Sequence, residues 1–168
     1  MLARETIRSV ARRHGMKAVF APKYDLTKAG NGMPVHVSLR DATTDRPIFC
    51  EGDKLTTTGG AFVEGILCHL EALRGLTLPT VNSFRRMGKG CWTGSEVGWA
   101  VEDKESGICV CSNLVSKAWD HVEYKLCDNT CNIYLALAGI LSCGMNGIER
   151  KATLRKALGS EGAKPDPA

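Results

Sequence analysis

Residues 121–148 read H-V-E-Y-K-L-C-D-N-T-C-N-I-Y-L-A-L-A-G-I-L-S-C-G-M-N-G-I. At the start of this stretch, apolar Val122, Tyr124 and Leu126 alternate with polar residues, which is the two-residue period of a strand with one buried face. Residues 132–141 are rich in leucine and alanine, which predicts a helix over this range, followed by Gly144. A strand and an apolar helix in succession need other elements to cover them, so the rest of the chain decides the layout.

Further helices and strands are predicted on the N-terminal side of this stretch. A helix is expected over 5–14, ended by Gly15, and a longer one from 56–58 to about Leu73, closed by Gly75. A loop is expected over 81–94. Strands are predicted at 17–22, 35–39, 98–102, 108–112 and 121–126. The pattern predicts an α+β fold in which an antiparallel sheet packs with two long helices.

The composition is that of one globular domain. The 168 residues include 22 Lys and Arg against 18 Asp and Glu, for a net charge of +4, and 43% are hydrophobic. This excludes a disordered chain, and no apolar run reaches the roughly 18 residues of a membrane span. Basic residues concentrate in 1–17, which is compatible with an organellar transit peptide or with an internal helix. Nucleic-acid binding is disfavoured because no aromatic residues separate these charges.

Eight cysteines are many for this length, and no apolar signal-peptide core follows the start, so we expect free thiols in a reducing compartment. A zinc site would use Cys109 and Cys111, then Cys127 and Cys131, with His121 between them. These spacings differ from the paired C-x2-C motifs of structural zinc sites. We therefore interpret Cys109 and Cys111 as two small residues on one face of a strand.

Three polar stretches are candidates for chemistry. Residues 30–39 place glycines before a strand that carries a histidine and a serine on one face. Residues 79–86 combine adjacent arginines with Asn and Ser, a set suited to a carboxylate or phosphate. Residues 121–134 place Glu123 between a histidine and a lysine, followed by Asp128. Each stretch alone is explained more simply as a turn, a pair of solvated charges or a solvated strand face.

Taken in order, these stretches resemble the C-terminal catalytic part of glutamine synthetase. The similar segments include R-E-T-I-R-S-V-A-R-R-H-G, N-G-M-P-V-H-V-S-L, P-T-V-N-S-F-R-R and the strand and helix of 121–148, and they cover about residues 3–155. The tryptophan-containing loop is most similar to the nodulin-type branch fused to amidohydrolases. The resemblance implies a partial catalytic domain over 1–155, followed by a disordered tail over 156–168. It also favours the internal helix over the transit peptide.

The family makes glutamine from glutamate and ammonia through a γ-glutamyl phosphate, using ATP with Mg²⁺ or Mn²⁺. The resemblance assigns glutamate binding to Gly30, Arg86 and Lys125. It assigns nucleotide binding to His36, Ser38 and Lys104, and metal binding to Glu123. It further implies a homo-oligomer, or a partner subunit that supplies missing elements, because family active sites lie between subunits. Neither a nucleic-acid partner nor a membrane span is expected, for the compositional reasons given above. Cytoplasm is the default location, with an organelle left open.

The same resemblance exposes departures from the family's pattern. Pro34 stands where the family has a metal-binding histidine. Lys104 and Cys109 stand where it has two arginines, and His121 and Lys125 replace two more. The family's N-terminal domain and its Glu-x-Glu strand have no counterpart in these residues. We therefore expect a domain that is inactive by itself. The alternatives are half of an active site completed by a partner chain, and a structural or assembly subunit.

Overall fold

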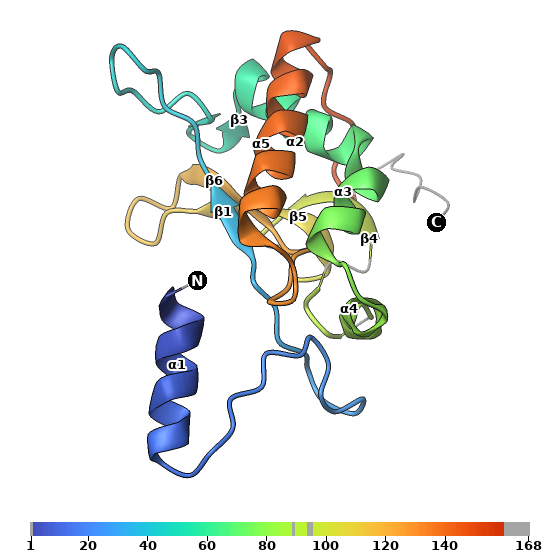
Figure 1. The fold of residues 1–168 in the computed structure, drawn as a ribbon. Helices are drawn as coiled ribbons and strands as arrows, with labels where there is room; N and C mark the ends of the chain where they lie inside the picture. The colour runs from blue at the N-terminus through green and yellow to red at the C-terminus, as the bar shows by residue number, and fades with distance from the viewer. Residues whose placement is uncertain (1, 89, 94–95, 160–168) are drawn as a thin grey trace.

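The computed structural model describes residues 2–88, 90–93 and 96–159 (Figure 1). It confirms the α+β class, with helices gathered mainly on one side of a sheet. The elements in order are α1 (Leu2–Arg13), β1 (Val35–Val37), β2 (Cys50–Glu51), β3 (Lys54–Leu55), α2 (Thr57–Cys68), α3 (Leu70–Thr77), α4 (Val81–Arg86), β4 (Glu96–Val101), β5 (Ser106–Ser112), β6 (Trp119–Tyr124) and α5 (Ile133–Glu149).

The main sheet has the strand order β1-β6-β5-β4, and its two faces have opposite characters. Val122 and Tyr124 of β6 and Ile108 and Val110 of β5 are fully buried and belong to the core with α2, α3 and α5. The residues between them on these strands point to the other face, because side chains alternate along a strand. The predicted alternation in 121–126 is therefore confirmed, and it sets which side chains face the pocket described below.

Glycines bring α2 and α5 into close contact behind the sheet. A Cβ atom on Gly147 would lie 2.0 Å from the carbonyl oxygen of Ala61, and one on Gly65 would lie 2.3 Å from that of Cys143. Gly144 faces the Phe62 ring, where a Cβ would lie 2.2 Å from Cε2. The helix predicted over 132–141 is longer than expected. Gly144 allows helix packing, and α5 continues to Glu149.

Two further helix predictions differ from the structure. The long helix expected to Leu73 is interrupted at His69, which leaves helical geometry with ψ at 13°. The imidazole Nε2 of His69 lies 3.1 Å from Asn146 Oδ1, so this side chain forms a hydrogen bond with α5. Part of the loop expected over 81–94 is the helix α4, which begins with a reciprocal capping box between Thr80 and Ser83.

Two predictions about strands were wrong. No strand forms over 17–22, because the backbone of Lys23 pairs with the Asn82 side chain and Pro22 accepts from Asn31 instead of from a neighbouring strand. The sheet is mixed, since β4 pairs with β5 in the parallel sense, while β1–β6 and β5–β6 are antiparallel. The connection 102–105 turns at Glu102, with φ of 51°, and at Asp103, whose carboxylate accepts backbone N–H groups from Glu105 and Ser106.

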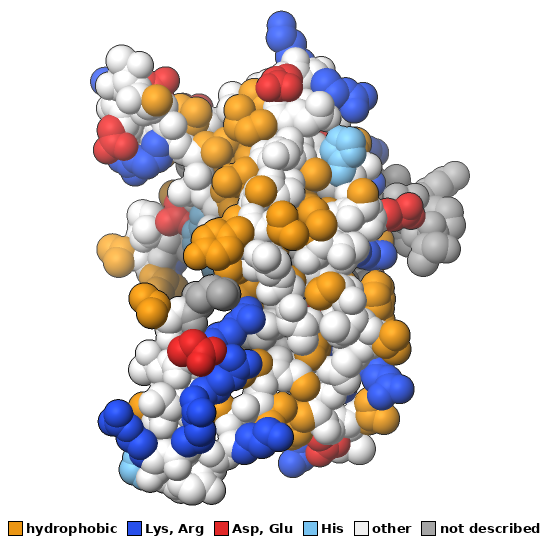
Figure 2. Space-filling model, in the orientation of Figure 1, with side chains coloured by type: hydrophobic (Ala, Val, Ile, Leu, Met, Phe, Trp, Pro, Cys, Tyr) orange, Lys and Arg blue, Asp and Glu red, His pale blue; other side chains and the backbone are white. Residues whose placement is uncertain are grey.

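The α1 helix lies apart from the body of the molecule, and its basic side chains form an exposed surface (Figures 1 and 2). Apolar side chains also gather over α5 in Figure 2, among them Leu135, Leu141 and Met145. No helix in the part of the chain that the structure describes combines the length and apolar character needed to cross a bilayer. Of the predicted tail, 160–168 lie outside the described residues, whereas Leu158 donates its N–H to Trp99 at 2.9 Å.

Candidate functional site

A cavity of about 500 Å³ opens on the face of the sheet that points away from α2 and α5. It brings together five of the seven site residues predicted from sequence, which are Gly30, Arg86, Lys104, Glu123 and Lys125, and Pro34 also lines it. The other two, His36 and Ser38, line a neighbouring pocket of about 330 Å³ together with Asp120 and His121. Glu123 of the first pocket lies near His36 of the second, with its Oε1 4.0 Å from His36 Nε2.

Arg86 forms the floor of the larger pocket. Its side chain is buried, and Nη2 donates to the carbonyl oxygens of Lys125 at 2.7 Å and Cys127 at 3.2 Å. A Cβ on Gly30 would lie 2.4 Å from both Arg86 Cγ and the carbonyl oxygen of Pro22, so this position requires glycine. A Cβ on Gly32 would lie 2.6 Å from Arg86 Nη1 and would displace the guanidinium group. Burial lowers the pKa of Arg86, although an arginine stays charged at neutral pH. Its neighbour Arg85 is exposed and takes no part.

Glu123 lies on β6 in the middle of the site, with β1 on one side and β5 on the other. Its partners across the sheet are His36 on β1 and Cys109 on β5. Lys125 Nζ lies 4.0 Å from Glu123 Oε2 and also donates to the carbonyl oxygen of Asp103. The Lys125 side chain is only 6% exposed, so this ammonium group is held in place beside the carboxylate.

Two cysteines share the face of β5 that carries the pocket, as predicted. Cys109 is buried and Cys111 is half-buried, and their sulfur atoms lie 3.9 Å apart. A hydrogen bond from the Cys111 thiol lowers the pKa of Cys109, and the same bond raises the pKa of Cys111 because this thiol is the donor. All eight cysteines are free thiols. Cys127 and Cys131 lie in the core, with their sulfur atoms 3.6 Å apart, so the four-cysteine zinc set is not assembled.

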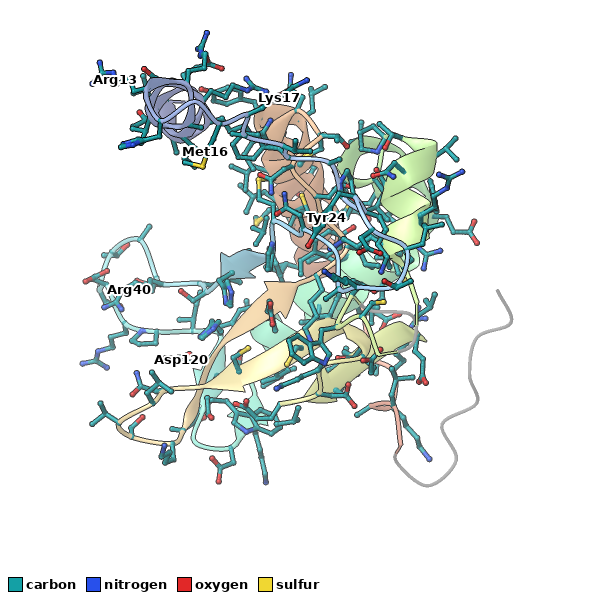
Figure 3. All side chains as sticks on the ribbon, turned by 90° about the horizontal axis from the view of Figure 1, so that it is seen from below. Arg13, Met16, Lys17, Tyr24, Arg40 and Asp120 are labelled. Atoms are coloured by element: carbon teal, nitrogen blue, oxygen red, sulfur yellow. The ribbon has the colours of Figure 1, made fainter. Side chains whose placement is uncertain are left out.

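Other residues of the pocket were not predicted from the sequence. Trp92 places its ring 4.9 Å from Lys104 Nζ, a cation–π contact. Glu102 and Asp103 contribute carboxylates to the lining, and Asp120 forms a hydrogen bond with His121 Nδ1. Asp120 and Arg40 lie at the same end of the sheet (Figure 3). Asp103 gave a local signal, because its side chain accepts from the N–H groups two and three residues further on. The contact between Trp92 and Lys104 depends on the tertiary fold.

Two polar residues of the third predicted stretch have structural roles. Asp128 is fully buried, and its Oδ1 accepts from the N–H and hydroxyl of Thr130. Asn132 caps α5, since its side chain accepts from the N–H groups of Tyr134 and Leu135. A cap of this kind satisfies helix N–H groups that otherwise have no partner. These residues position β6 and α5 rather than line the pocket.

Comparisons with known proteins agree on one family. The family model described as "Glutamine synthetase, catalytic domain" matches residues 1–168. Glutamine synthetase from Thermococcus kodakarensis is 38% identical over 149 residues, which cover 88% of this chain and 32% of that protein. Gamma-glutamylpolyamine synthetase GlnA3 from Streptomyces coelicolor is 33% identical, over 100% of this chain and 37% of that protein.

Comparison with solved structures indicates the same family. A crystal structure described as a novel glutamine synthase homolog superposes with a TM-score of 0.80 at 31% identity, covering 92% of this chain and 39% of that one. Ligand-free GmaS superposes with a TM-score of 0.81 at 28% identity, covering 98% and 39%. The chain spans about a third of the length of these curated relatives. It belongs to the glutamine synthetase family, and it corresponds to part of that family's catalytic domain.

Proposed function

We propose that this domain keeps the glutamine synthetase fold but does not by itself support magnesium-dependent ligase chemistry. The observation that carries the proposal is the set of groups around Glu123. Its neighbours are an imidazole, a lysine ammonium and two thiols, whereas Mg²⁺ prefers oxygen ligands and is weakly bound by thiols. Pro34 lines the same pocket and has no side-chain donor atom.

The other carboxylates of the pocket do not supply the missing oxygen ligands. Glu102 Oε1 accepts from the N–H and hydroxyl of Ser112 at 2.7 and 2.6 Å. Asp103 Oδ1 accepts from the N–H groups of Glu105 and Ser106. Both are used to hold the chain connection between β4 and β5. The residues present therefore do not fit Mg²⁺ with ATP.

The cationic side of the pocket is also weakened. Phosphoryl transfer relies on fixed positive charge around the phosphate oxygens, and bidentate arginines supply it with a defined geometry. Lys104 and Lys125 retain charge without the planar fork, and Lys125 already contacts Glu123 and a backbone carbonyl. One guanidinium nitrogen of Arg86 already donates hydrogen bonds to two backbone carbonyls. The glutamate and nucleotide roles that the resemblance implies stay predictions.

Calorimetric titration with Mg²⁺ and ATP tests this proposal. We expect no saturable binding to the purified chain at millimolar ATP, and an unchanged titration for Glu123→Ala, because Glu123 alone does not make a magnesium site. Glu71→Ala, which removes an exposed carboxylate on α3, serves as the matched control. Saturable binding that is lost in Glu123→Ala and kept in Glu71→Ala would overturn the proposal and favour half of an active site completed by a partner chain.

A further inference from the structure

The pocket face of the sheet collects side chains that suit a different metal. Strand pairing places Cys111 opposite His121, and Cys109 and His36 on either side of Glu123. Ligand atoms of His36, Cys111 and His121 all lie within 4.8 Å of one another, and so do those of Cys109, Cys111 and Glu123. Cys111 belongs to both sets, so its sulfur lies at the centre of the cluster.

From this geometry we infer that the cluster is a binding site for one zinc-class transition-metal ion. Cys111, His36 and His121 are the ligands, and water takes the fourth position, as it does in sites with three protein ligands. Thiolate and imidazole groups favour borderline and soft divalent ions over Mg²⁺ or Ca²⁺. The inference concerns metal binding only, and it stands whether or not the domain forms glutamine.

The spacing of the ligand atoms suits a single ion. Those of Cys111, His36 and His121 lie within 4.8 Å of one another. Zinc bonds sulfur at about 2.3 Å and imidazole nitrogen at about 2.0 Å, so one ion between these atoms can contact all three. The rings of His36 and His121 have centroids 5.0 Å apart and are tilted by 53°, so they approach the cluster from separate directions.

A second observation concerns the orientation of His121. Its Nδ1 forms a hydrogen bond with the carboxylate of Asp120. Histidines that bind metals commonly donate their other ring N–H to a carboxylate, which fixes the tautomer and the ring orientation. This bond leaves Nε2 of His121 to coordinate. The His121 side chain is 28% exposed and that of His36 is 54% exposed, so a metal ion can enter from solvent.

Metal titration of the reduced, metal-free chain tests the inference. We expect one Co²⁺ per chain, with the thiolate-to-cobalt charge-transfer band and the intense visible bands of a tetrahedral ion, and displacement of cobalt by Zn²⁺. Cys111→Ser and His121→Gln should each weaken zinc binding by more than about 100-fold, and Asp120→Asn by about 10- to 100-fold. Circular dichroism of each variant establishes that the fold is kept.

The matched control is Cys127→Ser, which disrupts the other close pair of cysteines in the core. This variant should bind zinc as the wild type does if it remains folded, and Cys68→Ser, at an exposed cysteine on α2, provides the same comparison without a core change. Three results would overturn the inference. They are equal zinc affinity in wild type and Cys111→Ser, a cobalt spectrum without the thiolate band, and a loss confined to Cys127→Ser.

Discussion

Gly147→Ala is expected to destabilise the domain by about 3 kcal/mol or more, at or above the upper end of the usual cost of overpacking a core. The added Cβ would lie 2.0 Å from the carbonyl oxygen of Ala61 and 2.7 Å from Gly65 Cα. Both atoms are backbone, so no flexible side chain can move aside. The helices α2 and α5 would have to separate, which would open the core behind the sheet. Urea denaturation followed by circular dichroism measures the loss.

Gly75→Ala provides the matched control for this prediction. Gly75 also lies in a helix, α3, but it is exposed, and an added Cβ would meet nothing within 4 Å. Since glycine in a helix costs about 0.5–1 kcal/mol relative to alanine, this variant should be slightly more stable than the wild type. Equal denaturation midpoints for Gly147→Ala and the wild type would contradict the described packing of α2 against α5.

Arg155→Ala is expected to cost about 2–3 kcal/mol at neutral pH. Glu64 on α2 is buried, and it accepts from Arg155 Nε at 3.1 Å, from Nη2 at 2.8 Å and from the backbone N–H at 3.0 Å. Truncating Arg155 leaves a buried carboxylate without its charged partner. The expected cost is below the usual range for a fully buried pair because the Arg155 side chain is 34% exposed. Thermal denaturation measures it, with Arg40→Ala, at an exposed ion pair, as the control.

The cost of Arg155→Ala should also depend on pH. Burial raises the pKa of Glu64, but the hydrogen bonds from Arg155 outweigh it and hold this pKa below its usual range. The pair therefore contributes its full stability above the unfolded-state pKa of about 4.3 and loses it as the pH falls through the lower folded-state pKa. The stability difference between wild type and Arg155→Ala should shrink below about pH 4. A difference that grows under acid conditions would contradict this pairing.

Local patterns predicted the elements that have regular periods. Val122 and Tyr124 identified β6, and the apolar run after Asn132 identified α5. The capping pair Thr80 and Ser83 was a local signal for α4 that the loop assignment overlooked. The break at His69 and the parallel pairing of β4 depend on contacts with distant residues, which neither propensity nor period encodes.

The candidate site was predictable only in part, for the same reason. The shared face of His121, Glu123 and Lys125 followed from alternation within one strand. The proximity of His36, Cys111 and His121 arises from the register between β1, β6 and β5, which a single strand does not reveal. Cys109 and Cys111 were therefore interpreted as packing residues, and the structure gives them ligand-like neighbours.

The measurement that tests the central claim most directly is product formation by the purified, reduced chain. The assay contains ATP, Mg²⁺ and glutamate with either ammonia or a polyamine, because one relative is named as a gamma-glutamylpolyamine synthetase. Replacing two charge-stabilising groups of an active site costs about 10⁴-fold or more in rate. We therefore predict no γ-glutamyl product above the protein-free blank. Product that increases in proportion to the chain and disappears in Glu123→Ala would contradict the account.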